Sequence, residues 1–197
     1  MTVDIMKKSI MLDLNMYMNN RGFTTLDDIT EGNLSVVKSS LPILPELKNV
    51  FYFKNVPYKL CYGNKKDNIE LDGQTIFFEQ IYKTNQINIV GLCLYGDYFD
   101  DLNFYLNGKL VKSVKISLSC CNSKLPAFKN ETFFHFPYTH NAKKGIIESY
   151  INLWLDEIFL DEVIAFDMIE LGDNPCMHIF AITILNDTQK GDEEEWN

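Results

Sequence analysis

Residues 102–118, LNFYLNGKLVKSVKISL, decide the fold class that the sequence predicts for this 197-residue chain. Asn107 and Gly108 supply the two positive φ values of a type I′ turn, the tight connection between two antiparallel strands. The flanking runs 102–106 and 109–118 are rich in aromatic and β-branched residues, which are typical of strands. The stretch therefore predicts a β-hairpin, and with it an antiparallel sheet.

Similar strand-like runs lie on both sides of this hairpin. Turn-forming pairs separate them: Asp72-Gly73 is a second hairpin candidate, and Asn85-Gln86 predicts another turn. Several short strands at this spacing predict a mainly antiparallel sheet. The further strands are expected at residues 50–53, 58–62, 75–82, 87–95, 163–169 and 177–185.

Three other segments predict helices. Residues 3–20 place apolar side chains at near-helical spacing, although a half-alternating strand is the other interpretation. Residues 25–40 predict a weaker helix, which Pro42 would end. Residues 143–160 carry the clearest helical pattern, in which apolar side chains form one stripe and the acidic side chains lie outside it, toward solvent. This stripe consists of Ile147, Tyr150, Ile151, Trp154, Leu155 and Ile158.

Together these patterns predict a single α+β domain over residues 1–190. It has a mainly antiparallel sheet, N-terminal helices, and the 143–160 helix packed on the sheet with Trp154 buried. A chain of this length can bury roughly 70% of the surface that its unfolded state exposes, so a core needs no disulfide or metal. Residues 191–197, GDEEEWN, lack an apolar pattern and predict an acidic, disordered tail.

The cysteines favour a reducing compartment. Their number is odd and no CxxC spacing occurs, so we expect buried free thiols. On a strand, the adjacent Cys120 and Cys121 would point to opposite faces, which disfavours a bond between them. No signal segment or membrane span is recognisable, and the expected location is the cytoplasm. The five cysteines are Cys61, Cys93, Cys120, Cys121 and Cys176.

Charge is distributed unevenly along the chain. The net charge is −9, but residues 1–144 carry +3 and residues 145–197 carry −12. No lysine or arginine lies between Lys144 and Lys190, so these acids predict an unbalanced negative field. A solvated face that aids solubility is the alternative. The expected partner-binding residues are Glu148, Asp156, Glu157, Asp161, Glu162, Asp167, Glu170 and Asp173.

The number and spacing of the basic residues indicate whether the partner is a protein or a nucleic acid. Lysines number 17, and Arg21 is the one arginine, which leaves few groups for bidentate phosphate recognition. Nucleic-acid binding needs clusters of basic side chains, and the lysine pairs here are short and dispersed. We therefore expect a basic protein partner, and neither nucleic acid nor membrane.

Candidates for catalytic or metal sites are few. His135 and His140 are separated by Pro137, which disfavours one helical face carrying both rings. Phosphate-binding glycine loops, GxSxG and HExxH are absent, so no cofactor and no metal are expected. Whether His135 and His140 form a site stays open, as it does for the acidic turn of Asp97, Asp100 and Asp101.

Size, the missing signal segment, the acidity of residues 145–197 and the missing catalytic motifs resemble the immunity proteins of contact-dependent and polymorphic toxin systems. The resemblance covers no motif that can be aligned, so it transfers no residue role. It implies a non-catalytic inhibitor that binds and neutralises a basic toxin domain, commonly a nuclease. Two alternatives stay open: a viral or host-interaction protein, and a small enzyme whose first candidates are His135, His140, Asp100 and Asp101.

Overall fold

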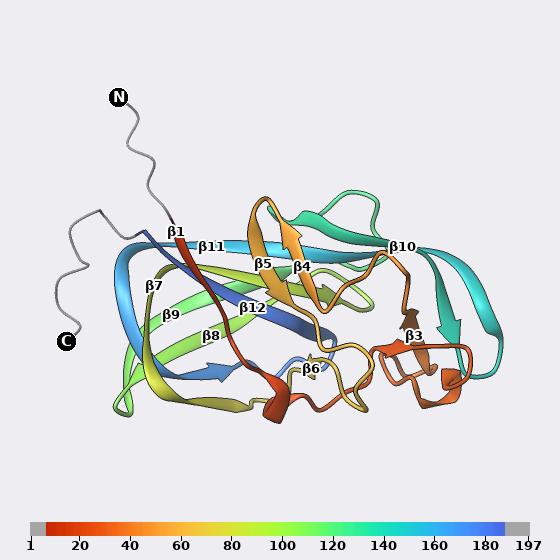
Figure 1. Cartoon of the computed structure of the whole chain (residues 1–197), viewed down its shortest axis with the longest axis horizontal. Coiled ribbons are helices and arrows are strands. Elements are labelled where there is room, and N and C mark those ends of the chain that lie inside the picture. Colours follow the sequence, from red (N-terminus) through yellow and green to blue (C-terminus); the bar gives the residue numbers. More distant parts are fainter. Residues whose placement is uncertain (1–6, 188–197) are drawn as a thin grey trace.

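The computed structural model describes residues 7–187 and is built almost entirely from β-strands (Figure 1). The predicted α+β class is wrong, because residues 7–187 contain two short 3-10 turns, η1 (Asn15–Tyr17) and η2 (Ile29–Glu31), and no α-helix. The strands are β1 (Lys7–Met11), β2 (Phe23–Thr24), β3 (Ser39–Pro42), β4 (Val50–Phe53), β5 (Val56–Lys59), β6 (Ile69–Glu70), β7 (Thr75–Cys93), β8 (Tyr98–Leu106), β9 (Lys109–Leu118), β10 (Glu131–Asn141), β11 (Gly145–Leu171) and β12 (Met177–Asp187).

Ten of these strands form one curled sheet, and β4 and β5 form a separate two-stranded hairpin beside it. The main strand order is β1-β12-β7-β11-β10-β3-β2. In addition, β6 pairs with β12, and β8 pairs with both β11 and β9. All of these pairings are antiparallel except β2 with β3.

The two longest strands, β7 and β11, bend together. Residues 160–163 of β11 lie opposite the single residue Asn85 of β7. Further along the same pair, residues 78–81 of β7 lie opposite Asp167 alone. Extra residues in one strand of a pair bend it and increase its twist. We therefore attribute the turn of β11, which Figure 1 shows at one end of the molecule, to these two insertions.

The centre of the sheet is covered on both faces. Ile87 and Ile89 of β7 join one apolar cluster, while Val90 and Leu92 of the same strand join the other. In β11, Trp154 belongs to the first cluster, and its indole is completely buried. The predicted burial of Trp154 is therefore confirmed.

The helix expected at residues 143–160 is wrong. Exposed and half-buried residues alternate from Gly145 to Ile151, which is the two-residue period of a strand. Residues 152–156 are then all buried, because both faces of the sheet are covered there. In such a strand, buried and exposed residues no longer alternate, and the sequence becomes a continuous apolar run. A run of this kind is also compatible with the apolar face of a helix, which is why the sequence pattern predicts a helix here.

The two N-terminal helices are wrong as well. Residues 7–20 of the first contain β1 and η1, and its residues 3–6 lie outside the described range. The second segment, 25–40, contains η2 and the start of β3. The tail at 191–197 also lies outside the described residues. Within residues 7–187, no helix is long and apolar enough to cross a membrane.

Of the three turns predicted from turn-forming residue pairs, one forms the expected hairpin and two do not. The hairpin at Asn107-Gly108 is confirmed: both residues have positive φ, 50° and 74°, and Leu106 pairs with Lys109. Asn85-Gln86 is not a turn, because it lies within β7. Gly73 has a positive φ of 76°, but β6 pairs with β12 rather than β7, so no hairpin forms there.

Candidate functional site

The eight acids predicted to bind a partner are spread along β11 and the turn that follows it. A strand rises about 3.3 Å per residue, so roughly 40 Å of strand separate Glu148 from Asp161. A helix would have placed its acids much closer together. Four of the eight are exposed to solvent: Glu148, Asp161, Glu162 and Asp173.

Asp156 is buried, contrary to the prediction that it faces solvent. One carboxylate oxygen accepts a hydrogen bond from the backbone N–H of Ser117 at 2.8 Å, and Asn130 Nδ2 lies 3.5 Å from the other. Burial raises the pKa of Asp156 to about 6. Its carboxylate therefore satisfies a backbone donor at the end of β9, and it is not part of an open surface.

Two further acids attach the β8–β9 hairpin to β11. The backbone N–H of Asn107 donates to both Asp167 oxygens, at 3.1 and 3.2 Å. Glu170 accepts hydrogen bonds from Tyr105 Oη at 2.6 Å and from Asn103 Nδ2 at 3.2 Å. Glu157 is half-buried, with Gln86 Nε2 at 3.5 Å. These carboxylates have structural partners within the sheet.

Exposed acids and exposed apolar side chains occur together at the two insertions. We call this set the acidic bend: Glu79 and Ile81 from β7, with Asp161, Glu162 and Val163 from β11. Ile81 is 56% exposed and Val163 is 51% exposed, and all three carboxylates are exposed. Lys83 lies between the insertions, opposite Ala165. None of the ion pairs found within residues 7–187 includes an acid of the bend.

The three histidines lie in separate environments. His135 is exposed, with its ring 4.1 Å from that of Tyr150 and its Nδ1 3.3 Å from Asn152 Oδ1. His140 and His178 are buried, and burial lowers the pKa of His178 to about 4. The structure therefore does not bring the histidines together as one site.

The acidic turn does not converge on a common point either. Asp97 accepts the backbone N–H of Cys120 at 2.7 Å, and Asp101 forms an ion pair with Lys115 at 2.5 Å. The Asp100 carboxyl lies against Gly172, so closely that a Cβ there would overlap it. Within residues 7–187, no group of three or more histidine, cysteine or acidic side chains is arranged to hold a metal ion.

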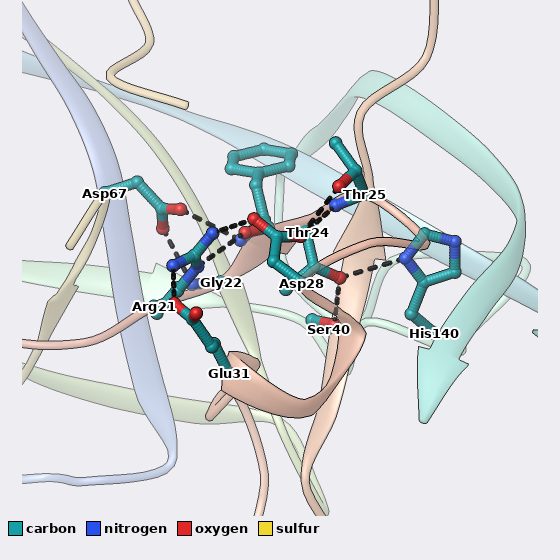
Figure 2. Close-up of polar contacts among 10 residues, drawn as sticks. Arg21, Gly22, Thr24, Thr25, Asp28, Glu31, Ser40, Asp67 and His140 are labelled. Atoms are coloured by element: carbon teal, nitrogen blue, oxygen red, sulfur yellow. Dashed lines mark hydrogen bonds and ion pairs between the residues drawn. The ribbon is translucent and has the colours of Figure 1, made fainter. Parts of the chain in front are cut away.

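Arg21 is used inside the fold. Figure 2 shows its guanidinium beside Asp28 and Glu31, with which it forms ion pairs, and Nε donates to the carbonyl of Phe23 at 3.3 Å. Asp67 accepts the backbone N–H groups of Gly22 and Phe23 at 2.7 and 2.9 Å. The arginine therefore organises this loop and is not presented to a phosphate.

A chain of polar side chains links β2, β3 and β10 next to this loop. Thr24 Oγ1 lies 2.7 Å from Ser40 Oγ and 2.9 Å from His140 Nδ1 (Figure 2). All three residues are at most 3% exposed, and burial lowers the pKa of His140. The arrangement brings hydroxyls next to an imidazole, but its burial leaves a substrate little access. Its role is to join three strands.

The pH dependence of protein stability tests the role of Asp67 in this region. Burial raises its pKa to about 6 from 3.8, so between pH 4 and 6 the folded protein binds this proton more tightly than the unfolded chain does. The stability that Asp67 contributes therefore decreases as pH rises through this window. Asp67→Ala leaves two backbone N–H groups unpaired, at about 1–3 kcal/mol each, but at pH 7 it also removes a buried charge.

We expect Asp67→Ala to be more destabilising at pH 4 than at pH 7, by about 2 kcal/mol. Urea unfolding of both proteins at both pH values measures this difference. Other titrating groups, such as Asp156 and His178, are present in both proteins and largely cancel. Equal destabilisation at the two pH values would contradict a raised pKa for Asp67.

A groove with a mainly apolar lining lies near the end of β7. Residues 34–41, which include the start of β3, form one side, and residues 94–95 and 120–122 form another, with Thr139 and Ile151 completing the lining. At its rim, Val36, Val37 and Tyr95 are exposed, and the Val36 N–H donates to Tyr95 Oη at 3.3 Å. No local sequence pattern marks this groove, because its sides come from five separate segments.

Comparisons with known proteins do not assign a family. No family model matches the chain, and no curated protein matches it. Among solved structures, the catalytic domain of GH87 α-1,3-glucanase in complex with nigerose is similar at 13% identity and a TM-score of 0.36. A variant of that domain with tetrasaccharides is similar at 14% identity and a TM-score of 0.37.

In both cases the match covers 62% of this chain and 22% of the glucanase chain. At TM-scores this low, the likeness carries no conclusion about activity. The comparisons also give no support to a toxin-immunity or toxin-inhibitor assignment.

Proposed function

We propose that this chain is a non-catalytic protein-binding module whose acidic bend receives a basic protein partner. The observation that carries the proposal is the coincidence, at two strand insertions, of exposed carboxylates with exposed apolar side chains. The acids of the bend form no ion pair with the described residues. Among residues 7–187, no basic side chain lies within ion-pair distance of these acids, and Lys83 is the cation that lies between the two insertions.

The two kinds of side chain serve different steps of binding. Asp161, Glu162 and Glu79 would steer a cationic partner and raise the association rate, an effect that salt screens. Ile81 and Val163 would provide apolar contacts that lose water in the complex. Glu148 and Asp173 are also exposed, and Glu148 has exposed apolar neighbours in Ile146 and Tyr150, but neither acid lies at the two insertions between β7 and β11.

Three of the eight acids expected to bind a partner have structural roles instead. Asp156, Asp167 and Glu170 accept hydrogen bonds within the sheet, so we assign them to structure. We propose a protein partner and not a nucleic acid, because Arg21 is engaged by Asp28 and Glu31 and the lysine pairs of the chain are short and dispersed. The five cysteines are free thiols, and the proposal places the chain in a reducing compartment, the cytoplasm.

Affinity capture from the native host tests the proposal with a matched pair of variants. The bend variant carries Asp161→Lys and Glu162→Lys, and the control carries Glu148→Lys and Asp173→Lys. Both change the net charge equally, and exposed substitutions usually alter stability by less than about 0.5 kcal/mol each. We expect a basic protein to co-purify with wild type and with the control, and to be lost with the bend variant. Equal capture by all three proteins would contradict the proposal.

A further inference from the structure

The strand β9 lies at an edge of the curled sheet. It pairs with β8 on one side, and no strand of residues 7–187 pairs with its other side. An edge strand presents backbone N–H and C=O groups to which another strand can add. Most residues from Lys109 to Lys115 are exposed, including Leu110 at 57% and Val111 at 40%. This part of β9, residues 109–115, is accessible to another chain, and we call it the open edge.

The peptide groups of Ser117 show how this edge is oriented. The Ser117 N–H donates to Asp156 Oδ2 at 2.8 Å, and the Ser117 carbonyl accepts a hydrogen bond from Asn130 Nδ2 at 2.8 Å. Both groups of Ser117 therefore point away from β8. In an antiparallel pair every second residue has this orientation, and the pairing with β8 is regular from Ser113 to Ser117. The N–H and C=O groups of Ser113 and Lys115 thus point outward as well.

The outward groups of Ser113 and Lys115 have no partner in the part of the chain that the structure describes. No hydrogen bond within residues 7–187 reaches them, because β8 is the one strand that pairs with β9. At Ser117, by contrast, a carboxylate and an amide side chain take the places of a neighbouring strand's carbonyl and N–H. An added strand would continue this pairing along the open edge, with a donor and an acceptor for each of the two residues.

The charge of β9 indicates which kind of strand would add. The strand carries Lys109, Lys112 and Lys115 and no acid. Lys115 forms an ion pair with Asp101 at 2.5 Å, whereas the ion pairs found within residues 7–187 include neither Lys109 nor Lys112. Pairing with the β9 of a second copy would bring like charges close together, which is unfavourable. The lysines favour an acidic strand instead.

Apolar side chains lie between these lysines. Leu110 and Val111 are exposed, and Val114 is half-buried against the apolar cluster that contains Trp154. An added strand would remove part of this apolar surface from water, which favours binding. Side chains of a strand point alternately to its two faces. The segment that fits the open edge is therefore extended and contains both acidic and apolar residues.

We propose that the open edge of β9 is a second interaction surface, which binds an extended acidic segment of another protein by strand addition. The backbone of the segment pairs with the outward groups of Ser113 and Lys115, and its carboxylates lie near Lys109 and Lys112. The proposal does not depend on the function proposed for the acidic bend, because the two surfaces accept partners of opposite charge.

Fluorescence anisotropy with the labelled peptide Glu-Val-Glu-Val-Glu-Val tests the proposal on the full chain. Ser113→Pro removes an outward N–H that takes no part in the pairing with β8, and proline is tolerated at such edge positions. Ser113→Ala keeps this N–H and is the matched control. We expect the proline variant to bind the peptide at least about fivefold more weakly than the alanine variant, the effect of one lost hydrogen bond. Equal affinity for the two variants, or no binding to wild type, would overturn the proposal.

The peptide Gln-Val-Gln-Val-Gln-Val tests the part played by charge, because it has the same backbone and no carboxylates. We expect it to bind wild type at least about tenfold more weakly than the acidic peptide at low salt. Equal binding of both peptides would contradict an acidic partner. Dimerisation of the free chain that Ser113→Pro abolishes would assign the edge to a second copy and would also overturn the proposal.

Amide hydrogen exchange, followed by NMR on wild type, locates the bound peptide without any variant. We expect saturating acidic peptide to slow exchange of the Ser113 and Lys115 N–H groups at least about tenfold, because they become hydrogen-bonded. The N–H of Glu162 at the acidic bend should keep its rate. Binding without slower exchange at Ser113 and Lys115 would place the peptide elsewhere and contradict strand addition.

Discussion

Replacing Trp154 by alanine is expected to lower the free energy of unfolding by about 3–5 kcal/mol. The indole is completely buried in the middle of β11, and its Nε1 donates to the Cys120 carbonyl at 3.2 Å. The substitution removes a large apolar side chain and leaves a cavity with an unpaired acceptor. Urea unfolding followed by circular dichroism measures the change, with an unchanged slope showing that the transition remains comparable.

Tyr150→Ala is the matched control, because a helix at residues 143–160 would bury Tyr150 and Trp154 on one stripe. In the strand, Tyr150 is 40% exposed and stacks on His135. We expect its loss to cost about 0.5–1.5 kcal/mol, the size of an aromatic pair interaction. Similar large losses for both variants would favour the helix and contradict the strand.

Asp156→Lys is expected to destabilise the protein by about 3–5 kcal/mol, because it puts an unpaired cation in a buried position. It also removes the acceptor of the Ser117 N–H. The sequence pattern places Asp156 off the apolar stripe, among the acids expected to bind a partner, whereas in the structure Asp156 is buried. Thermal and urea unfolding measure the loss.

Asp161→Lys makes the same charge change on the same strand at an exposed position. We expect a change in stability within about 0.5 kcal/mol. If Asp156→Lys were equally neutral, Asp156 would have to face solvent, and its assignment to structure would be wrong. This comparison separates burial from net charge, since both variants alter the net charge equally.

Local chemistry explains what the sequence predicts well. The Asn107-Gly108 turn depends on two adjacent residues that tolerate positive φ, so its prediction needs no knowledge of the rest of the fold. The strand at residues 50–53 and that near 177–185 are confirmed for a related reason. Their aromatic and β-branched side chains favour extended backbone, and flanking turn residues mark their ends.

The helix error arises from long-range packing. Residues 152–156 pair with β7 on one side and β10 on the other, and apolar clusters cover both faces. No local signal shows that both faces are covered, and a doubly buried strand resembles a helical stripe. Likewise, the join of the predicted strands 75–82 and 87–95 into β7 depends on pairing with β11.

For the candidate sites, too, local features can be predicted from the sequence and long-range contacts cannot. Sequence alone identifies the excess of acids in β11, but which of them are buried depends on distant partners, such as Ser117 for Asp156 and Asn107 for Asp167. Likewise, an isolated bridge places Cys93 opposite Cys120, although the two residues come from separate segments. A cysteine count cannot reveal such proximity.

The acidic bend is tested most directly by the association kinetics of the captured basic partner with three proteins: wild type, the Asp161→Lys/Glu162→Lys variant, and the Glu148→Lys/Asp173→Lys control. At 0.1 M salt the screening length is about 10 Å, and at 1 M it is about 3 Å. We predict that the bend variant slows association at least about tenfold at the lower salt, that the control changes it much less, and that the three rates converge at the higher salt. Equal slowing by the bend variant and the control, or none by either, would contradict a partner surface at the bend.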